Sequence, residues 1–138
     1  MDRKWFSYHW RVRYHETDQM GVVYHANYAN WFEIGRTELI RELGIPYSEI
    51  EKRGLLIPVT RLEIHYRHPA KYDDLVEIRT AIASCTNVRI AFDVEIARDG
   101  TVLAEGATHH VWVNREWRPV RLDKVYPELY ALIKSQCS

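Results

Sequence analysis

Asp18 and His25 are the side chains whose types and positions best suit chemistry, because both stand at the approach to the longest apolar stripe in the chain. Asp18 lies in the polar turn 17–21, which ends in a glycine. A helix start carries unpaired backbone N–H groups and about half a positive charge. A carboxylate is favoured there in its ionised form, as a base or nucleophile. A substrate carbonyl against the same N–H groups would be polarised, as in an oxyanion hole, and this combination indicates acyl transfer.

A simpler role for Asp18 is an Asx-turn or a helix cap, since aspartate before a helix is common. The local pattern alone favours that simpler role. His25 likewise has two interpretations, either proton transfer and carbonyl binding or a hydrogen bond at the helix start.

A long helix is expected directly after this segment. It begins somewhere in residues 24–27 and runs to about Leu43, because Gly44 and Pro46 then form a strong stop signal. Gly35 falls on its buried stripe, where the missing side chain would allow close approach to a sheet, at a cost of about 1 kcal/mol against alanine. Residues 46–53 form a candidate second helix. The stripe consists of Tyr28, Phe32, Gly35, Leu39 and Leu43.

The remaining segments follow a period of two, which is typical of strands. One strand is predicted over residues 5–14, and four more follow. The first of these four begins at about residue 55, and the others extend over 75–84, 88–97 and 101–113. Asp99-Gly100 is a short hairpin signal, and 127–134 is predicted as a terminal helix. Tight turns imply antiparallel neighbours. The fold class is therefore α+β, with a five-stranded antiparallel sheet wrapped around one long helix.

Residues 18–28 resemble the signature of the 4-hydroxybenzoyl-CoA thioesterase family, and are most similar to its short-chain acyl-CoA thioesterase branch associated with Tol-Pal genes. The similarity extends over about residues 12–130. It implies a hot-dog fold, which agrees with the order of elements derived above. The further matching residues are Tyr14, Thr17, Glu33, residues 36–38 and the turn 72–75.

The resemblance also implies roles for individual residues. Asp18 would be the catalytic nucleophile or general base, and the backbone N–H near Tyr24 or His25 would polarise the thioester carbonyl. His25 would assist in catalysis, while Tyr14 and Tyr28 would line the acyl pocket, although core packing is an equally good role for Tyr28. Arg89 falls where a coenzyme A contact occurs in the family, but a solvated strand position explains it slightly better.

Composition narrows the remaining possibilities. The chain has 138 residues, which fits a single domain over 1–138, and its 19 basic and 19 acidic residues cancel. The balanced charge predicts no nucleic-acid partner, and no membrane insertion, metal or cofactor is expected. No leader peptide is expected either, so the predicted location is cytoplasmic. Cys85 and Cys137 are far apart in sequence and indicate no disulfide framework.

The expected ligand is an acyl-CoA carrying a short-chain or aromatic acyl group. Two alternatives stay open: a non-catalytic acyl-CoA-binding protein, and a hydrolase of acyl-carrier-protein thioesters. A dehydratase is disfavoured because His25 and Glu33 lie about two helical turns apart. The resemblance further implies a homodimer or homotetramer, with the site between protomers.

Overall fold

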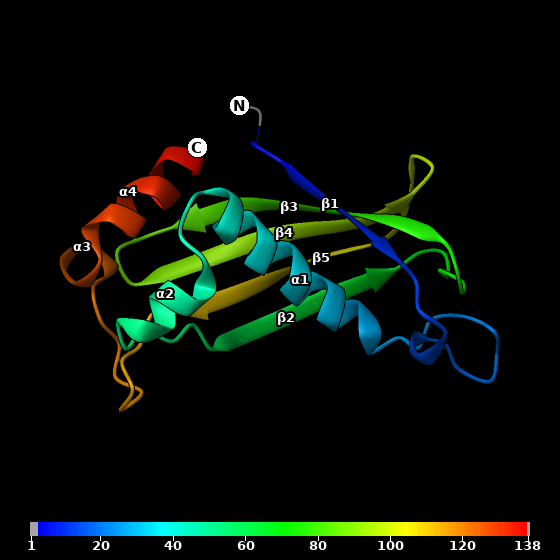
Figure 1. Cartoon of the computed structure of the whole chain (residues 1–138), viewed down its shortest axis with the longest axis horizontal. Helices are drawn as coiled ribbons and strands as arrows, with labels where there is room; N and C mark the ends of the chain where they lie inside the picture. Colours follow the sequence, from blue (N-terminus) through cyan, green and yellow to red (C-terminus); the bar gives the residue numbers. More distant parts are fainter. Residues whose placement is uncertain (1–2, 138) are drawn as a thin grey trace.

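The predicted strands form one antiparallel sheet with the order β1-β3-β4-β5-β2, and the long helix α1 (Asn27–Glu42) lies across one face of it (Figure 1). This computed structural model describes residues 3–137. The hot-dog arrangement expected from the sequence is thus confirmed. The strands are β1 (Phe6–Arg11), β2 (Val59–Tyr66), β3 (Leu75–Cys85), β4 (Arg89–Arg98) and β5 (Thr101–Val111).

The hairpin between β4 and β5 shows how directly local chemistry sets this sheet. Asp99 and Gly100 have φ values of 51° and 82°, so both occupy the left-handed region that a two-residue hairpin turn requires. On β4, the alternating apolar residues Ile90, Phe92, Val94 and Ile96 are all buried. Because a slip by one residue would turn these four large side chains to the other face of the sheet, their burial fixes the register of this strand.

Helix α1 approaches the sheet at Gly35. A Cβ atom placed there would lie 2.2 Å from Thr80 Oγ1 and 2.8 Å from Ile78 Cγ2, both on β3. These distances are far below van der Waals contact, so any side chain would push the helix away. The close approach predicted for Gly35 is confirmed.

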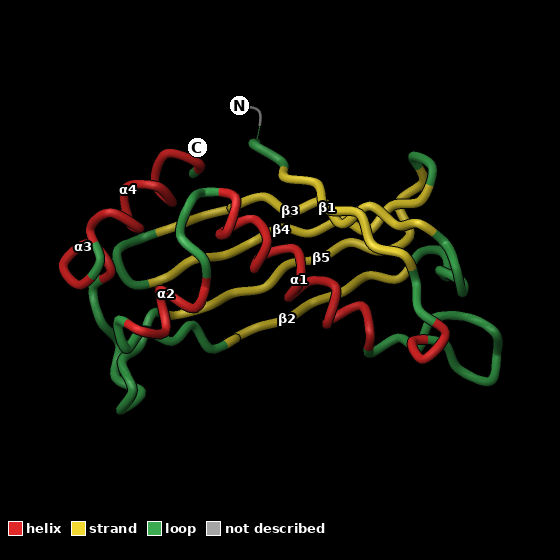
Figure 2. The backbone as a smooth tube through the Cα atoms, viewed as in Figure 1, coloured by secondary structure: helices red, strands yellow, loops and turns green. Residues whose placement is uncertain are grey.

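Figure 2 shows the backbone of α1 running across the sheet. Two clusters of apolar side chains pack around this helix. One lies under the first half of the helix and includes Tyr28, Trp31 and Phe32. The other lies under its end, where three short helices cover the sheet: α2 (Tyr47–Lys52), α3 (Leu122–Val125) and α4 (Pro127–Gln136). Helices α2 and α4 were predicted, whereas the single turn of α3 was not.

Two groups in the second cluster have unusual environments. His110 is almost fully buried, with Nδ1 3.1 Å from the Ile57 carbonyl and Nε2 2.8 Å from Thr108 Oγ1. Burial lowers its pKa to about 4. Cys85 and Cys137 both pack against this cluster as free thiols. Burial and a direct hydrogen bond with the Cys137 thiol raise the pKa of Cys85 to about 11.

The strand predicted over residues 5–14 was too long. β1 ends at Arg11, and Tyr14–Glu16 form a single 3-10 turn. The Glu16 N–H donates to the Arg13 carbonyl, while the Glu16 carboxylate accepts the Arg13 N–H at 2.7 Å. These two bonds bend the chain, and period-two patterning cannot reveal them. Among residues 3–137, no helix is long and apolar enough to cross a membrane.

Candidate active site at the start of the long helix

A buried carboxylate organises the segment that leads into α1. Glu16 is only 6% exposed, and its carboxylate accepts the indole N–H of Trp31 at 2.8 Å and that of Trp10 at 3.1 Å. With the Arg13 amide, three donors surround it. Trp10 belongs to β1 and Trp31 to α1, so this side chain fixes the entering loop against both elements.

The backbone carbonyl of Glu16 is equally engaged. It accepts the Tyr24 N–H at 2.9 Å and the Asn27 side-chain amide at 2.8 Å. The Tyr24 amide is therefore occupied, which corrects the expectation that it could polarise a substrate carbonyl. Within residues 3–137, the amides of His25 and Ala26 have no acceptor. These two N–H groups are the ones left for a ligand at the helix start.

Asp18 lies in a tight, half-buried loop beside this helix start. Its Oδ1 accepts the Met20 N–H at 2.9 Å, and its own N–H donates to the Val22 carbonyl at 2.9 Å. Thr17 and Val23 pair as an isolated β-bridge that closes the loop. The Asx-turn considered as the simpler role is thus present. It engages one carboxylate oxygen, and Asp18 itself is not among the residues that line the cavity beside Tyr28.

A cavity of about 270 Å³ opens next to the helix start. Tyr28 and Tyr66 form an aromatic wall, with ring centroids 5.1 Å apart and an edge-on angle of 88°. The Tyr28 hydroxyl accepts the Ala70 N–H at 3.0 Å, and burial raises the pKa of Tyr28. Tyr28 therefore serves both the core and the cavity. The complete lining is Val23, His25, Tyr28, Tyr66, Arg67, His68 and Pro69.

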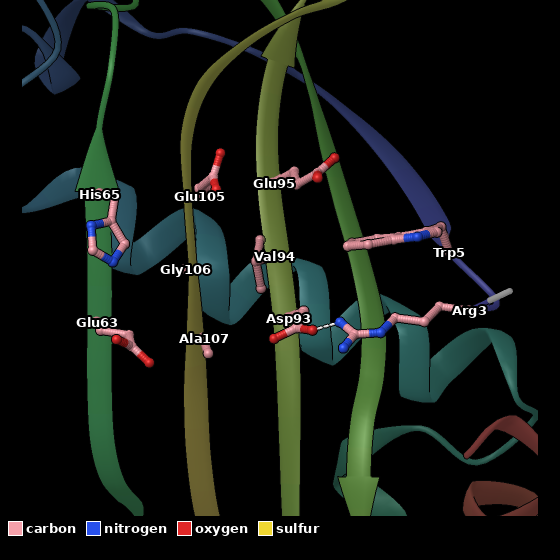
Figure 3. A pocket seen from close by; sticks show the side chains of 10 residues that line it. All are labelled: Arg3, Trp5, Glu63, His65, Asp93, Val94, Glu95, Glu105, Gly106 and Ala107. Atoms are coloured by element: carbon pink, nitrogen blue, oxygen red, sulfur yellow. Dashed lines mark ion pairs between the residues drawn. The ribbon is translucent and has the colours of Figure 1, made fainter. Parts of the chain in front are cut away.

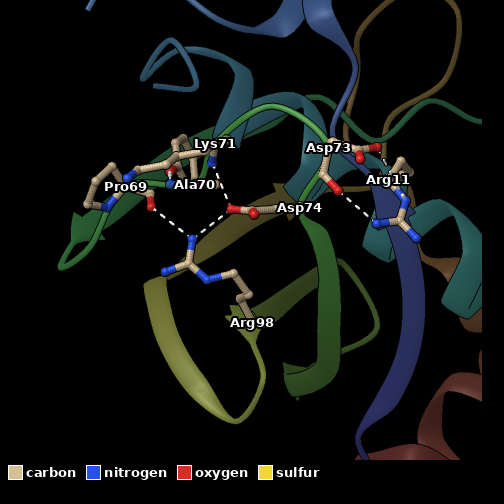
Figure 4. Close-up of polar contacts among 8 residues, drawn as sticks. Arg11, Pro69, Ala70, Lys71, Asp73, Asp74 and Arg98 are labelled. Atoms are coloured by element: carbon tan, nitrogen blue, oxygen red, sulfur yellow. Dashed lines mark hydrogen bonds and ion pairs between the residues drawn. The ribbon is translucent and has the colours of Figure 1, made fainter. Parts of the chain in front are cut away.

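The back of this cavity is the turn that was predicted between β2 and β3 (Figure 4). Arg98 donates to Asp74 at 2.6 Å and to the Pro69 carbonyl at 3.3 Å, and Asp74 also accepts the Lys71 N–H at 2.8 Å. Both acids of the turn are thereby engaged in structure, because Asp73 pairs with an arginine of β1. The turn holds Ala70 against Tyr28.

Two of the predicted site residues lie elsewhere in this chain. Tyr14 is 77% exposed and packs edge-on against Tyr72, at 5.6 Å between ring centroids. Arg89 pairs with Val111 at one end of β5, whereas Tyr66 pairs with Ala104 near the other. Seven residues of strand separate these two pairings, which corresponds to roughly 23 Å. Within one chain, Arg89 therefore lies far from the cavity at the helix start.

A second cavity, of about 330 Å³, lies on the face of the sheet opposite α1 (Figure 3). Its lining includes Arg3, paired with Asp93, and a half-buried tryptophan, Trp5. Four acidic side chains line it, and each of them forms an ion pair with an arginine. These acids are Glu63, Asp93, Glu95 and Glu105.

Sequence reasoning missed Glu16 and Tyr66. The Tyr66 hydroxyl donates to the His25 carbonyl at 2.8 Å, across a sequence separation that no local pattern spans. The sequence contained one signal that Glu16 is a buried hydrogen-bond acceptor. Buried tryptophans need an acceptor for the indole N–H, and Trp10 and Trp31 flank a segment that contains a carboxylate.

This fold and site define a class of protein. Residues 12–132 match the model of the thioesterase-like superfamily, and the chain belongs to that family. The predicted enzyme class, a thioester hydrolase, is thereby confirmed at the level of the family.

The relatives show the same class. The chain is 40% identical over 119 residues to the putative acyl-CoA thioesterase YneP of Bacillus subtilis, covering 85% of this chain and 86% of that one. It is 34% identical over 121 residues to the acyl-CoA thioesterase YbgC of Haemophilus influenzae, covering 86% and 89%. The crystal structure of a DHNA-CoA thioesterase from Staphylococcus aureus superposes with a TM-score of 0.92 at 32% identity, covering 95% and 89%.

Proposed function

We propose that this chain hydrolyses acyl-CoA thioesters at the start of α1. The observation that carries the proposal is the N–H of His25, which has no acceptor among residues 3–137 and belongs to a residue that lines a cavity with an aromatic wall. Such donors are suited to bind the oxygen that becomes negative in acyl transfer. The thioesterase relatives support the same reaction.

Asp18 supplies the attacking group in this proposal. Thr17 pairs with Val23, and Val23 lines the cavity, so Asp18 follows directly after the pair that borders it. As a general base, Asp18 takes a proton from water while the water oxygen bonds to the carbonyl carbon. As a nucleophile, it forms an acyl-enzyme anhydride that water then opens. In either case the carbon–sulfur bond breaks, and coenzyme A leaves readily as a thiolate.

His25 contributes a backbone donor and a ring at the edge of the cavity. The acyl group lies in the cavity against the wall formed by Tyr28 and Tyr66, which suits a short or an aromatic acyl chain. Membership of the Tol-Pal-associated branch and a cytoplasmic location are finer parts of the same proposal.

A homodimer, or a tetramer built from it, completes the site in this proposal. β2 pairs with β5 on one side only, and within residues 3–137 its other edge has no partner strand. Leu62 and Tyr66 on this strand are 46% and 49% exposed. An exposed apolar edge strand is a template for pairing. Because Tyr66 also lines the cavity, a partner at this edge would border the acyl group.

Light scattering on Leu62→Glu should show a smaller species than the unchanged chain, and an unchanged chain that is already monomeric would refute the dimer.

The test of the function is thiol release from a series of acyl-CoA and acyl-carrier-protein thioesters. Asp18→Asn should lower turnover by about a thousandfold, because the amide is neither base nor nucleophile, while the fold stays intact. Asp99→Asn, in the distant hairpin turn, is the matched control and should keep full activity. Near-normal turnover in Asp18→Asn would remove this mechanism. Binding of acyl-CoA without thiol release would favour a non-catalytic acyl-CoA-binding protein. Preference for the carrier-protein thioester would favour a hydrolase of acyl-carrier-protein thioesters.

A further inference from the structure

A third cavity, of about 260 Å³, is formed by side chains of α1 and α2. It shares no lining residue with the cavity at the helix start. Residues three and four apart lie on one face of a helix, so its three side chains from α1 point the same way. The central one, Arg36, comes nine residues after Asn27, which is roughly 14 Å along the helix axis. The complete lining is Glu33, Arg36, Thr37 and Tyr47, the last being the first residue of α2.

The guanidinium of Arg36 is the unusual group in this cavity. Its side chain is only 11% exposed, and burial lowers the pKa of Arg36, although the group stays charged at neutral pH. Within residues 3–137 it makes no hydrogen bond, and the Glu33 carboxylate approaches it only to 3.6 Å. A charge that has left water is costly unless hydrogen bonds replace its lost hydration. The N–H donors of Arg36 therefore lack the acceptors that would offset this cost.

The chemistry of the lining suits a carboxylate. A guanidinium presents its N–H groups as a planar fork, which matches the two oxygens of a carboxylate. Thr37 adds a half-buried hydroxyl. Burial raises the pKa of Tyr47, so the hydroxyl of this residue stays protonated and can donate as well.

Glu33 is the lining residue that opposes an incoming anion. Its side chain is 68% exposed, and its oxygen lies beyond hydrogen-bond distance of the Arg36 guanidinium. An ion pair with so exposed a partner is weak, because water solvates the carboxylate. A ligand carboxylate that makes direct hydrogen bonds to Arg36 can therefore displace Glu33 into solvent.

We propose that this cavity binds a small carboxylate ligand through the Arg36 guanidinium, with the Thr37 and Tyr47 hydroxyls as further donors. The volume is several times the share of about 30 Å³ that one water molecule takes in the liquid, so it admits more than water. None of the groups assigned to thioester hydrolysis takes part, so this site does not depend on that reaction.

Benzoate is the probe for this site, and benzamide, which has nearly the same shape without the charge, is the control ligand. Calorimetric titration of the unchanged chain should show benzoate binding with about millimolar affinity, which a ligand of this size commonly reaches. Benzamide should bind at least about tenfold more weakly, because it loses the charge-assisted hydrogen bonds. Equal binding of the two, or no binding of benzoate, would overturn the proposal. Preference for orthophosphate over benzoate would contradict the carboxylate class.

Two variants should shift the affinity for benzoate in opposite directions. Arg36→Gln should weaken binding at least about tenfold, because the charged donor is lost. Glu33→Gln should strengthen binding about threefold, because the competing carboxylate is gone. Arg61→Gln and Glu63→Gln are the matched controls, since these two residues form a similar pair, 3.8 Å apart, on the opposite face of the sheet. Neither control should change the affinity.

The outcomes of these titrations decide the proposal separately. Unweakened binding to Arg36→Gln would place benzoate elsewhere, such as in the cavity beside Tyr28, and would refute this site. If Arg36→Gln fails to fold, which thermal unfolding shows, Glu33→Gln decides alone. Unchanged or weaker binding of benzoate to Glu33→Gln would then refute the site.

Discussion

The Trp31 indole donates a hydrogen bond to the Glu16 carboxylate at 2.8 Å, inside a core where Trp31 is fully buried. This contact joins the first turns of α1 to the loop that carries Asp18. The carbonyl of the same Glu16 accepts the Tyr24 amide. One residue therefore anchors the loop through its side chain and sets, through its backbone, which amides remain free at the helix start.

Replacing Glu16 with glutamine should destabilise the protein and lower its activity together. Glutamine keeps one accepting oxygen, but its NH2 cannot accept a hydrogen bond, so the donors that face the NH2 lose their acceptor. We expect the free energy of unfolding to fall by about 3 kcal/mol. Urea unfolding measures the loss, and Glu116→Gln on the exposed surface should change little. A variant as stable as the parent would show that these donors are satisfied in another way.

Gly35→Ala should destabilise the protein by about 2 kcal/mol, because the new methyl group would overlap Thr80 and Ile78. Thr80 Oγ1 is buried without a hydrogen-bond partner, so Thr80→Ala removes the nearest obstruction at little cost. The double variant should recover part of the lost stability. Strictly additive losses in thermal unfolding would contradict this explanation of the close approach.

Stability should fall as the pH drops from about 6.5 to about 4, because His110 is neutral in the folded state and protonated in the unfolded chain over that range. A histidine whose pKa is lower in the folded state than in the unfolded chain contributes stability at pH values above the unfolded pKa. That contribution is lost as the pH falls toward the folded pKa. The difference in pKa corresponds to roughly 3 kcal/mol. Urea unfolding of His110→Gln at both pH values should show a smaller loss. His109→Gln, on the other face of β5, should behave like the parent.

Mild oxidation with hydrogen peroxide should join the thiols of Cys85 and Cys137. In this reaction two thiols and one hydrogen peroxide yield one disulfide and two waters. Because the pKa of Cys85 is about 11, the rate should rise with pH well above neutrality. Closing a loop of this length should stabilise the fold by about 4 kcal/mol. Mass spectrometry identifies the product, and Cys137→Ser is the control. Formation of intermolecular disulfides alone would show that the pair cannot close.

The elements that sequence predicted well are those whose signals are local. The alternation on β4 and the Asp99-Gly100 turn each depend on residues that are neighbours in sequence. The end of α1 is equally local, since Gly44 and Pro46 stop it. The shortened β1 is different, because the bonds between Arg13 and Glu16 override the pattern of the strand.

The candidate site was predictable only in part. Sequence pointed to the helix start, where Tyr28 and His25 line a cavity in the structure. It did not identify Glu16, because glutamate is seldom buried and the flanking tryptophans alone do not show which carboxylate accepts their indole N–H groups. Tyr66 was equally hidden, since its contact with His25 depends on how the sheet brings the end of β2 to the helix.

The bare outer edge of β2 has a consequence for how this protein behaves in solution. Leu62 and Tyr66 present apolar surface beside backbone groups that seek a partner strand. Unpaired edges of this kind promote precipitation when no matching strand covers them. In the dimer proposed above, strand pairing covers this edge, so a change that separates the copies without adding charge to the edge should also lower the solubility of the chain.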